Sequence, residues 1–222
     1  MIIPAELARV NLDDALEFQH PDFIAEEKFD GVRAVVHVEE QVRVTGRRIG
    51  ADGQVLPLRL HHPLPAFHAM LLGCVLDSEL MADGTFHVFD LLRHHGQDTR
   101  PLPLRERKAR LASLSDYMPA AVRLVASYAC PAAIPSFREG IVIKDLRSRY
   151  GHGWWKAKRI ETHDVRLLRV GDNGVAETEG RGKVQGVPPG IQAGDMIEVR
   201  AFALFASGKL RNGRFMRVRA DK

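Results

Sequence analysis

Cysteine is scarce in this sequence and occurs only twice in 222 residues. Cys74 lies in an apolar stretch, Cys130 lies among alanine and proline, and the two do not form a CxxC pair. Zinc sites and disulfide frameworks need several cysteines at set spacings, so we expect neither kind of site. The two thiols are expected to be buried and reduced, which is typical of a cytoplasmic protein.

Long hydrophobic runs are also missing. Apolar residues make up 45% of the chain, yet no stretch approaches the ~20 consecutive apolar residues that a membrane-spanning helix needs. The segment 1–6 does not combine a basic region with an apolar core, so a signal peptide is not expected. We therefore predict a cytoplasmic protein that does not engage a membrane.

The charge is confined to one part of the chain. Residues 162–222 contain 11 lysines and arginines against 7 acidic residues, and they carry the whole net charge of +4. Residues 1–161 contain 21 of each sign and are balanced. A basic excess restricted to one segment indicates a surface that faces a polyanion such as nucleic acid.

Residues 1–161 have the pattern of an α+β nucleotide-binding domain. Strands are predicted over 24–27 and 33–38, on either side of a turn at 28–31. A helix is predicted over 104–114, directly after a proline, and a short one over 64–72. Further strands are predicted over 41–47, 74–80, 85–91, 141–144 and 154–158.

Residues 162–222 have a different pattern. Short apolar runs at 165–170, 196–203 and 215–218 are separated by glycine-rich turns. Several short strands at this spacing predict a small β-barrel, and an OB-fold suits both the size and the basic charge. Residues 186–190, rich in glycine and proline, are predicted to form a loop.

Six short motifs follow one another in a fixed order along the chain. Each is a weak signal alone, but together they resemble the ordered motifs of the covalent nucleotidyltransferases, and most closely those of the ATP-dependent DNA ligases. The resemblance runs from about Pro4 to the C-terminus. It rests on the segments Glu26-Glu27-Lys28-Phe29-Asp30-Gly31-Val32-Arg33, Asp77-Ser78-Glu79-Leu80, Phe86-His87-Val88-Phe89-Asp90, Glu139-Gly140-Ile141-Val142-Ile143-Lys144, Trp154-Trp155-Lys156-Ala157-Lys158 and Arg219-Ala220-Asp221-Lys222.

The lysine of the first motif would be the nucleophile. A lysine has a reference pKa of ~10.4, so attack on a phosphate needs nearby cations and partial burial to release its proton. Lys156 and Lys158 are two residues apart on a predicted strand, so both face the same side, together with Trp154. By resemblance, Lys28 is adenylated, and Lys156 and Lys158 contact the α-phosphate.

The resemblance also implies a binding site for the nucleoside of ATP. Glu26 would accept a hydrogen bond from the adenine amino group, while Arg33 and Glu79 would hold the ribose. Phe89 would stack on the adenine face. Read from the residues alone, Phe89 suits a core position on a strand equally well, and the two roles are compatible.

Further roles concern the phosphates and the metal. Lys144 would face the phosphates, and Glu139 with Glu79 would bind Mg²⁺ or Mn²⁺, which prefer oxygen ligands. Asp30 lies in the active-site turn and would act in the steps that follow lysine adenylation.

Two basic segments resemble the elements that engage DNA and pyrophosphate. Arg47, or its neighbour Arg48, resembles the arginine that grips the 5′-phosphate at a nick, although Gly46 stands where the family has serine. We favour Arg47. The run 207–222 resembles the end of a ligase OB domain, whose final element orients the pyrophosphate leaving group through Arg219, Asp221 and Lys222.

The sequence is therefore identified as a minimal ATP-dependent DNA ligase, with an adenylation domain over 1–161 and an OB-fold domain over 162–222. It is expected to seal 5′-phosphate/3′-hydroxyl nicks in duplex DNA through a lysyl-AMP intermediate. ATP is favoured over NAD because Lys28 lies near Met1 and only two cysteines are present, which leaves no room for the extra domain and zinc element of NAD-dependent ligases. We expect a monomer without an obligatory protein partner, and DNA binding of modest affinity that weakens strongly with salt.

Two alternatives remain open at this stage. RNA ligases and capping-type nucleotidyltransferases share the Lys-x-Asp-Gly core, although the C-terminal run favours a DNA ligase. A non-catalytic nucleic-acid-binding module would have lost Lys28, Glu139 or Lys158, and all three are present. The sequence does not discriminate among replication, repair, and phage or plasmid maintenance. It also does not say whether residues 175–190, read as a loop of the OB-fold, become ordered on DNA.

Overall fold

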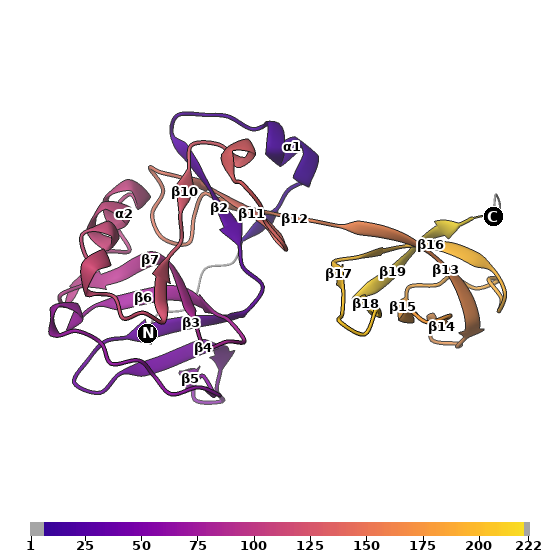
Figure 1. Ribbon diagram of the computed structural model, residues 1–222, viewed down its shortest axis with the longest axis horizontal. Coiled ribbons are helices and arrows are strands. Elements are labelled where there is room, and N and C mark those ends of the chain that lie inside the picture. The colour runs from indigo at the N-terminus through magenta and orange to yellow at the C-terminus, as the bar shows by residue number, and fades with distance from the viewer. Residues whose placement is uncertain (1–6, 220–222) are drawn as a thin grey trace. The chain divides into compact units, whose positions relative to one another are not determined.

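The computed structural model describes residues 7–219 and divides the chain into two compact units, one ending at Ala157 and the other beginning at Lys158. Most of the described residues that are in regular structure form strands. Two α-helices occur in this part of the chain, α1 (Leu12–Glu17) and α2 (Leu104–Ala112), and both belong to the first unit (Figure 1). The first unit was predicted to be an α+β domain, but it contains fewer helical residues than expected and is mostly strand. The predicted domain boundary after residue 161 stays a prediction.

The first sheet of the first unit brings together strands from both ends of that unit. Its order is β1 (Ala8–Arg9), β12 (Trp154–Lys158), β11 (Gly140–Asp145), β2 (Phe23–Lys28) and β10 (Ser127–Tyr128). On one face Ala25, Ile141 and Ile143 join a core with α1. Alternate residues of a strand point to opposite faces, so Glu26 and Lys28 belong to the other face.

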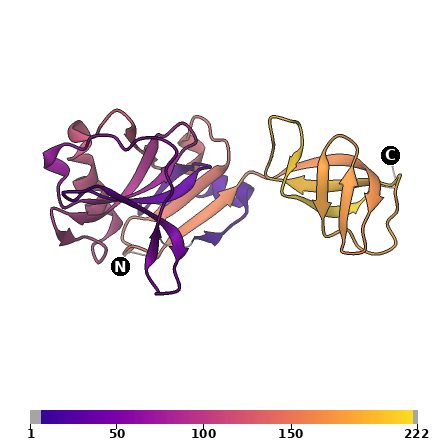
Figure 2. The same cartoon turned by 90° about the horizontal axis from the view of Figure 1, so that it is seen from below.

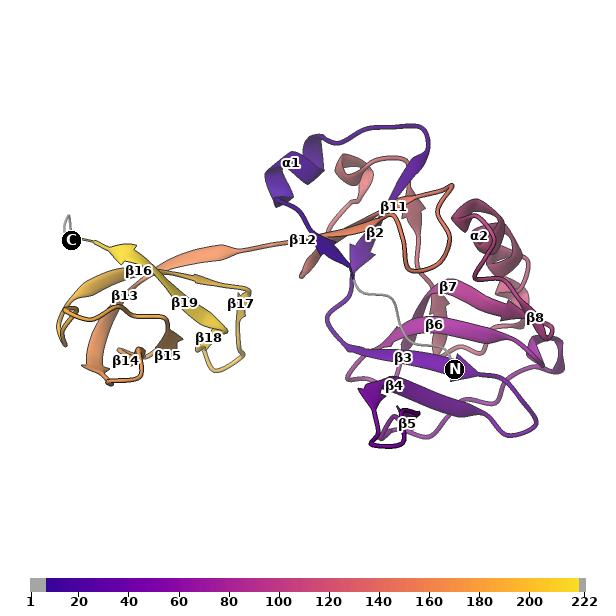
Figure 3. The same ribbon diagram turned by 180° about the vertical axis from the view of Figure 1, so that it is seen from behind.

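The second sheet follows directly in the chain (Figure 3). Its order is β5 (Val55–Pro57), β4 (Arg43–Ile49), β3 (Val32–His37), β6 (Val75–Leu80), β7 (Phe86–His94) and β8 (Gln97–Asp98), with β9 (Val122–Leu124) paired to β7. Ala34, Val36 and Val44 form a core with Leu111 of α2 on one face. Arg33, Val35 and His37 therefore lie on the opposite face.

Helix predictions were right only for α2. It begins after Pro103 as expected but ends at Ala112, and a 3₁₀ turn, η2 (Ser115–Tyr117), follows. The helix predicted over 64–72 was wrong, because only the 3₁₀ turn η1 (Ala69–Leu71) forms there. Pro63 and Pro65 disfavour helical conformation in the residues before them. A third turn, η3 (Pro131–Ala133), precedes β11. Within residues 7–219, the helices are all too short to reach across a membrane.

The second unit is a closed barrel of β13 (Glu161–Val170), β14 (Val175–Thr178), β15 (Gly182–Gln185), β19 (Gly213–Val218) and β16 (Met196–Ala201), seen in Figure 2. A small ribbon of β17 (Ala203–Leu204) and β18 (Leu210–Arg211) accompanies it. The barrel has its own core, which includes Val165, Ile197 and Val199. The treatment of 175–190 as a loop was wrong in part, because β14 and β15 pair there as a hairpin.

Candidate active site

The candidate site lies where the chain passes from the first sheet to the second. Lys28 ends β2, residues 29–31 form the connection, and β3 begins at Val32 in the other sheet. The connection is tight, since a Cβ on Gly31 would come within 2.3 Å of the Leu80 carbonyl oxygen. Only glycine avoids this contact, which explains the Asp-Gly pair in the first motif.

Lys28 is held by an acidic partner from far along the chain. Its ammonium group forms an ion pair with the carboxylate of Glu139 and lies 3.4 Å from the Phe29 carbonyl oxygen. The side chains of Lys28 and Glu139 are 18% and 9% exposed. The pair forms because β2 and β11 run antiparallel with Gly140 opposite Lys28. Two residues predicted separately from the sequence are thereby brought together.

Glu26 is the centre of a buried charge network. Lys144 donates to its Oε2 at 2.5 Å, Ser127 donates to its Oε1 at 2.9 Å, and Lys108 forms an ion pair with it. Burial opposes ionisation of this carboxyl, but the two lysines outweigh burial, and the pKa of Glu26 is lowered. Burial also opposes the charged form of Lys144, which for a lysine means a lower pKa, here about 8.

Lys108 and Ser127 were missed by the sequence reading. A signal for Lys108 existed, because it lies four residues after Leu104 and three before Leu111, and both leucines are buried. Positions at this spacing share one helix face, so Lys108 belongs to the side of α2 that faces the protein. Ser127 carries no comparable signal, since it lies on a two-residue strand.

Arg33 is buried and paired with the carboxylate of Asp77. Its Nε donates to Asp77 Oδ1 at 2.5 Å, and the hydroxyl of Tyr150 donates to Asp77 Oδ2 at 2.6 Å. Burial opposes the charge on Arg33, but Asp77 outweighs it, and the pKa of Arg33 is raised. Asp77 and Tyr150 were not among the predicted site residues, although Asp77 lies inside the second motif.

Phe89 presents its ring to two cations. The guanidinium carbon of Arg33 lies 4.5 Å and the ammonium nitrogen of Lys144 lies 4.7 Å from its ring centroid. Lys144 is also 4.2 Å from the ring of Trp154, whose centroid lies 6.3 Å from that of Phe89. The aromatic surface of the site is therefore electrostatically matched to positive charge.

The acidic residues of the site suit a metal ion that substrate phosphates also bind, not one held by protein ligands alone. Glu79 Oε1 accepts from the Gly31 amide at 3.3 Å, and burial raises the Glu79 pKa against the opposing charges of Lys28, Arg33 and Arg47. Among residues 7–219, no cluster of three or more His, Cys, Asp or Glu residues could hold a metal. Mg²⁺ commonly binds through one or two carboxylates together with substrate phosphates and water.

The remaining predicted residues are distributed over both units. Asp30 is exposed in the connection, Arg47 is exposed on β4, and Lys156 lies on β12 two residues from Trp154. Lys158 opens the second unit, where its ammonium lies 4.7 Å from the ring of Phe202. Arg219 also belongs to that unit and donates to Asp164 Oδ1 at 2.9 Å. The predicted residues Asp221 and Lys222 lie outside the described residues.

Comparisons with known proteins point in one direction. No family model matches the sequence. A protein of Streptomyces griseus named "Probable DNA ligase" is 30% identical over 193 residues, covering 65% of this chain and 37% of the relative. The chain thus spans little more than a third of that relative's length.

Two solved structures share the fold. A Lig E DNA ligase, studied for DNA binding with a minimal scaffold, matches with a TM-score of 0.70 and 15% identity, over 99% of this chain and 100% of the other. Mycobacterial DNA ligase D complexed with ATP matches with a TM-score of 0.55 and 18% identity, over 99% and 95%. The resemblance to DNA ligases that the motifs indicate is confirmed.

Proposed function

We propose that this chain is an ATP-dependent DNA ligase that seals 5′-phosphate/3′-hydroxyl nicks in duplex DNA. The observation that carries the proposal is the pairing of Lys28 with Glu139, at the junction of two sheets in a fold shared with DNA ligases. The ion pair holds the Lys28 amine at this junction, and it sets Glu139, the proposed metal ligand, beside the amine.

The first step would join AMP to the protein. The neutral amine of Lys28 attacks the α-phosphorus of ATP and gives up one proton to solvent. A P–N bond forms, the bond to the bridging oxygen of the β-phosphate breaks, and pyrophosphate leaves. Reaction of this kind depends on positioning and on charge stabilisation around the phosphates.

Two further steps would transfer the activated group to DNA. An oxygen of the 5′-phosphate attacks the α-phosphorus, which breaks the P–N bond and returns a proton to Lys28. The 3′-hydroxyl then attacks the 5′-phosphorus, which forms the phosphodiester and releases AMP. Asp30, exposed beside Lys28, is our candidate for assisting these later steps, and Arg47 is our candidate for the 5′-phosphate.

The nucleoside would be recognised by the buried network. An ionised carboxylate offers about four acceptor positions, and Lys144, Lys108 and Ser127 use three on Glu26. The fourth position would accept from the adenine amino group, and the half-buried ring of Phe89 would stack on the base. Glu79 and Arg33 would hold the ribose. Arg33 would use the N–H groups that do not donate to Asp77.

Charge on the phosphates would be offset by lysines and by a divalent metal ion. Glu139 and Glu79 would hold Mg²⁺ or Mn²⁺, which would neutralise phosphate charge in the manner of oxygen-bound divalent ions. Lys144, Lys156 and Lys158 would contact the phosphates. We propose that the barrel is an OB-fold domain over 162–222 and that its end orients pyrophosphate through Arg219, Asp221 and Lys222. A monomer acting without an obligatory protein partner stays our expectation.

The test combines an adduct measurement with nick sealing. Incubation with ATP and Mg²⁺ should add the mass of one AMP to the wild-type protein, and the protein should then close a 5′-phosphorylated nick. Lys28→Ala should lose both, because it lacks the nucleophile. Glu27→Gln, a change one residue earlier on the same strand, should retain both.

Other outcomes discriminate among the alternatives. An adduct without sealing of DNA, together with sealing of nicked RNA, would move the assignment to an RNA ligase. No adduct with ATP, GTP or NAD would contradict the enzyme assignment and favour a non-catalytic binding module.

A further inference from the structure

One face of the second sheet continues beyond the proposed active site. β3 pairs with β4 so that Val35 lies opposite Thr45 and His37 lies opposite Arg43. Paired residues project to the same side, so Arg43 and Thr45 share the face of Arg33. Arg47 belongs to the same region, since its charge opposes the rise that burial causes in the pKa of Glu79.

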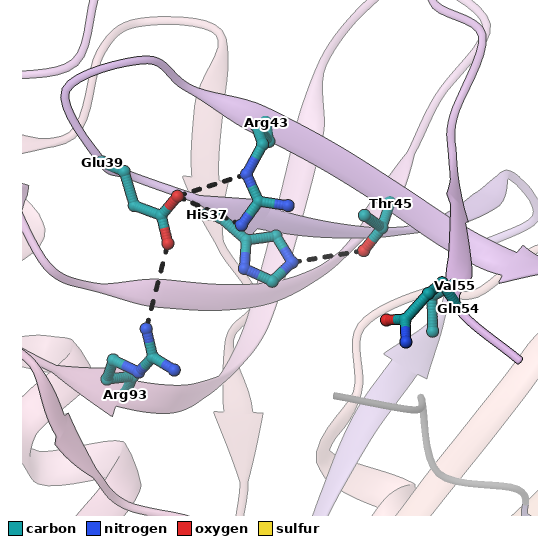
Figure 4. Close-up of a pocket in the computed structure, with 7 residues that line it drawn as sticks. All are labelled: His37, Glu39, Arg43, Thr45, Gln54, Val55 and Arg93. Carbon is teal, nitrogen blue, oxygen red and sulfur yellow. Dashed lines mark hydrogen bonds and ion pairs between the residues drawn. The ribbon is translucent and has the colours of Figure 1, made fainter. Parts of the chain in front are cut away.

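A polar pocket of ≈ 220 Å³ opens on this face (Figure 4). Glu39 lies between two arginines there. Arg43 donates to Glu39 Oε2 from Nε at 3.2 Å and from a terminal nitrogen at 3.1 Å. Arg93 lies 3.9 Å from Glu39 Oε1. A carboxylate held by two guanidiniums marks a position where an anion is stabilised from both sides.

The arginines at this pocket remain accessible to a ligand. The side chains of Arg43 and Arg93 are 57% and 40% exposed, and that of Glu39 is 40% exposed. Exposed ion pairs contribute little to stability, so exchanging the Glu39 carboxylate for another anion costs little. A guanidinium binds phosphate through two parallel N–H groups, as it binds a carboxylate.

Buried donors lie beside the arginines. His37 and Thr45 are buried, and His37 Nε2 lies 3.2 Å from Thr45 Oγ1. If the ring nitrogen donates, the hydroxyl proton is available to a ligand. If the hydroxyl donates, the proton on the other ring nitrogen is available. Burial and then Arg43 lower the pKa of His37, so the neutral ring leaves the pocket with one net positive charge from its two arginines and one glutamate.

We propose that this pocket binds a phosphodiester of the DNA duplex away from the nick, with Arg43 and Arg93 exchanging Glu39 for the phosphate. The proposal rests on the proposed DNA ligase function. Strands rise ~3.3 Å per residue, so Arg43 and Arg47 are about 13 Å apart along β4. The duplex axis rises about 3.4 Å per base pair, so this distance corresponds to at most about four base pairs. The pocket would therefore fix the duplex several nucleotides from the phosphate that Arg47 engages.

The test is binding to a nicked duplex between 50 and 200 mM salt, by fluorescence anisotropy. The double variant Arg43→Ala/Arg93→Ala should lower the slope of log affinity against log salt by about 1 and the affinity by about tenfold near 50 mM salt, because one phosphate contact is lost. Glu39→Gln should bind several-fold more tightly, because the competing carboxylate charge is removed. A variant that merely failed to fold could not gain affinity.

The matched control is Arg105→Ala. Arg105 is 54% exposed on α2, the helix whose Leu111 packs on the opposite face of the sheet, so its removal should leave the slope unchanged. If the double variant behaves like Arg105→Ala while the wild type forms an AMP adduct and seals nicks, the pocket proposal is wrong and the ligase proposal stands. If the double variant lowers the slope while the wild type forms no AMP adduct, the pocket proposal is supported and the ligase proposal is wrong.

Discussion

Glu26 and Lys144 show how a buried site can hold charges of opposite sign. Both are almost fully buried, at 1% and 2% exposed, and isolated charges in such a place would be strongly disfavoured. Their mutual pairing, with Lys108 and Ser127 around Glu26, keeps the carboxylate ionised and ready to accept a further donor. Removing either lysine should therefore affect both stability and nucleotide binding.

Lys144 should also make stability depend on pH. Its pKa is about 8 in the folded protein against 10.5 in the unfolded chain, so the folded state binds fewer protons between these values. The free energy of unfolding should then rise as pH increases through this window, by on the order of 2–3 kcal/mol. Urea unfolding at pH 7.5, 9 and 10 should show this rise in the wild type relative to Lys144→Met. Parallel curves for the two proteins would contradict the assignment.

At the scale of elements, the connection between β2 and β3 decides the geometry of the site. It carries the chain from one sheet to the other within three residues, and its Gly31 approaches the carbonyl of Leu80 on β6. Two strands of different sheets are thus held at a fixed separation beside Lys28. The position of Lys28 follows from this packing as much as from its own strand.

Gly31→Ala should displace this connection. The added Cβ would lie 2.3 Å from the Leu80 carbonyl oxygen, a backbone atom that cannot move without shifting β6. Overpacking of this kind typically costs 1–3 kcal/mol, roughly the loss expected in chemical denaturation, and AMP adduct formation should slow. The control is Gly46→Ala, whose Cβ would lie 3.4 Å from the nearest atom, in the side chain of Leu58. Equal losses in both variants would contradict the steric explanation.

At the scale of the whole molecule, the chain forms two units with separate cores. The core of the barrel is made of residues of the second unit alone, and most of the candidate site belongs to the first. The basic excess is carried by residues 162–222, which gives the barrel the charge suited to a polyanion. Each unit can therefore be studied by itself.

Residues 158–222 expressed alone should fold as the closed barrel. The expected stability is about 3–5 kcal/mol, because a domain of this size buries a small core. Cooperative thermal unfolding followed by circular dichroism would show it. Ile197→Asp, at a position that is fully buried, should abolish the transition, whereas Leu168→Asp, at a position 57% exposed, should preserve it. A fragment without a cooperative transition would mean that the barrel depends on the first unit.

The sequence alone predicted the reactive residues of the site and most of the strands around them, because both depend on short stretches of neighbouring residues. The order of the motifs carried the resemblance to ATP-dependent DNA ligases, and β-branched and apolar runs predicted most strands near the site. Local patterns failed where other constraints acted. Pro65 disfavours helical conformation at Leu64, where the helix predicted over 64–72 was to begin. The polar, glycine-rich hairpin of β14 and β15 was read as a loop. The roles assigned to individual residues stay predictions.

By itself, the sequence determined which reactive side chains are present, their order, and the strands that carry them, because these depend on neighbouring residues. Only the tertiary structure decided which of them meet. Lys28 and Glu139 are separated by 111 positions and Arg33 and Asp77 by 44, and strand pairing across the sheets joins them. The packing of α2 placed Lys108 against Glu26, and the pairing of β3 with β4 helped to build the pocket around Glu39. Contacts between distant residues depend on sheet register and packing, which no local pattern encodes.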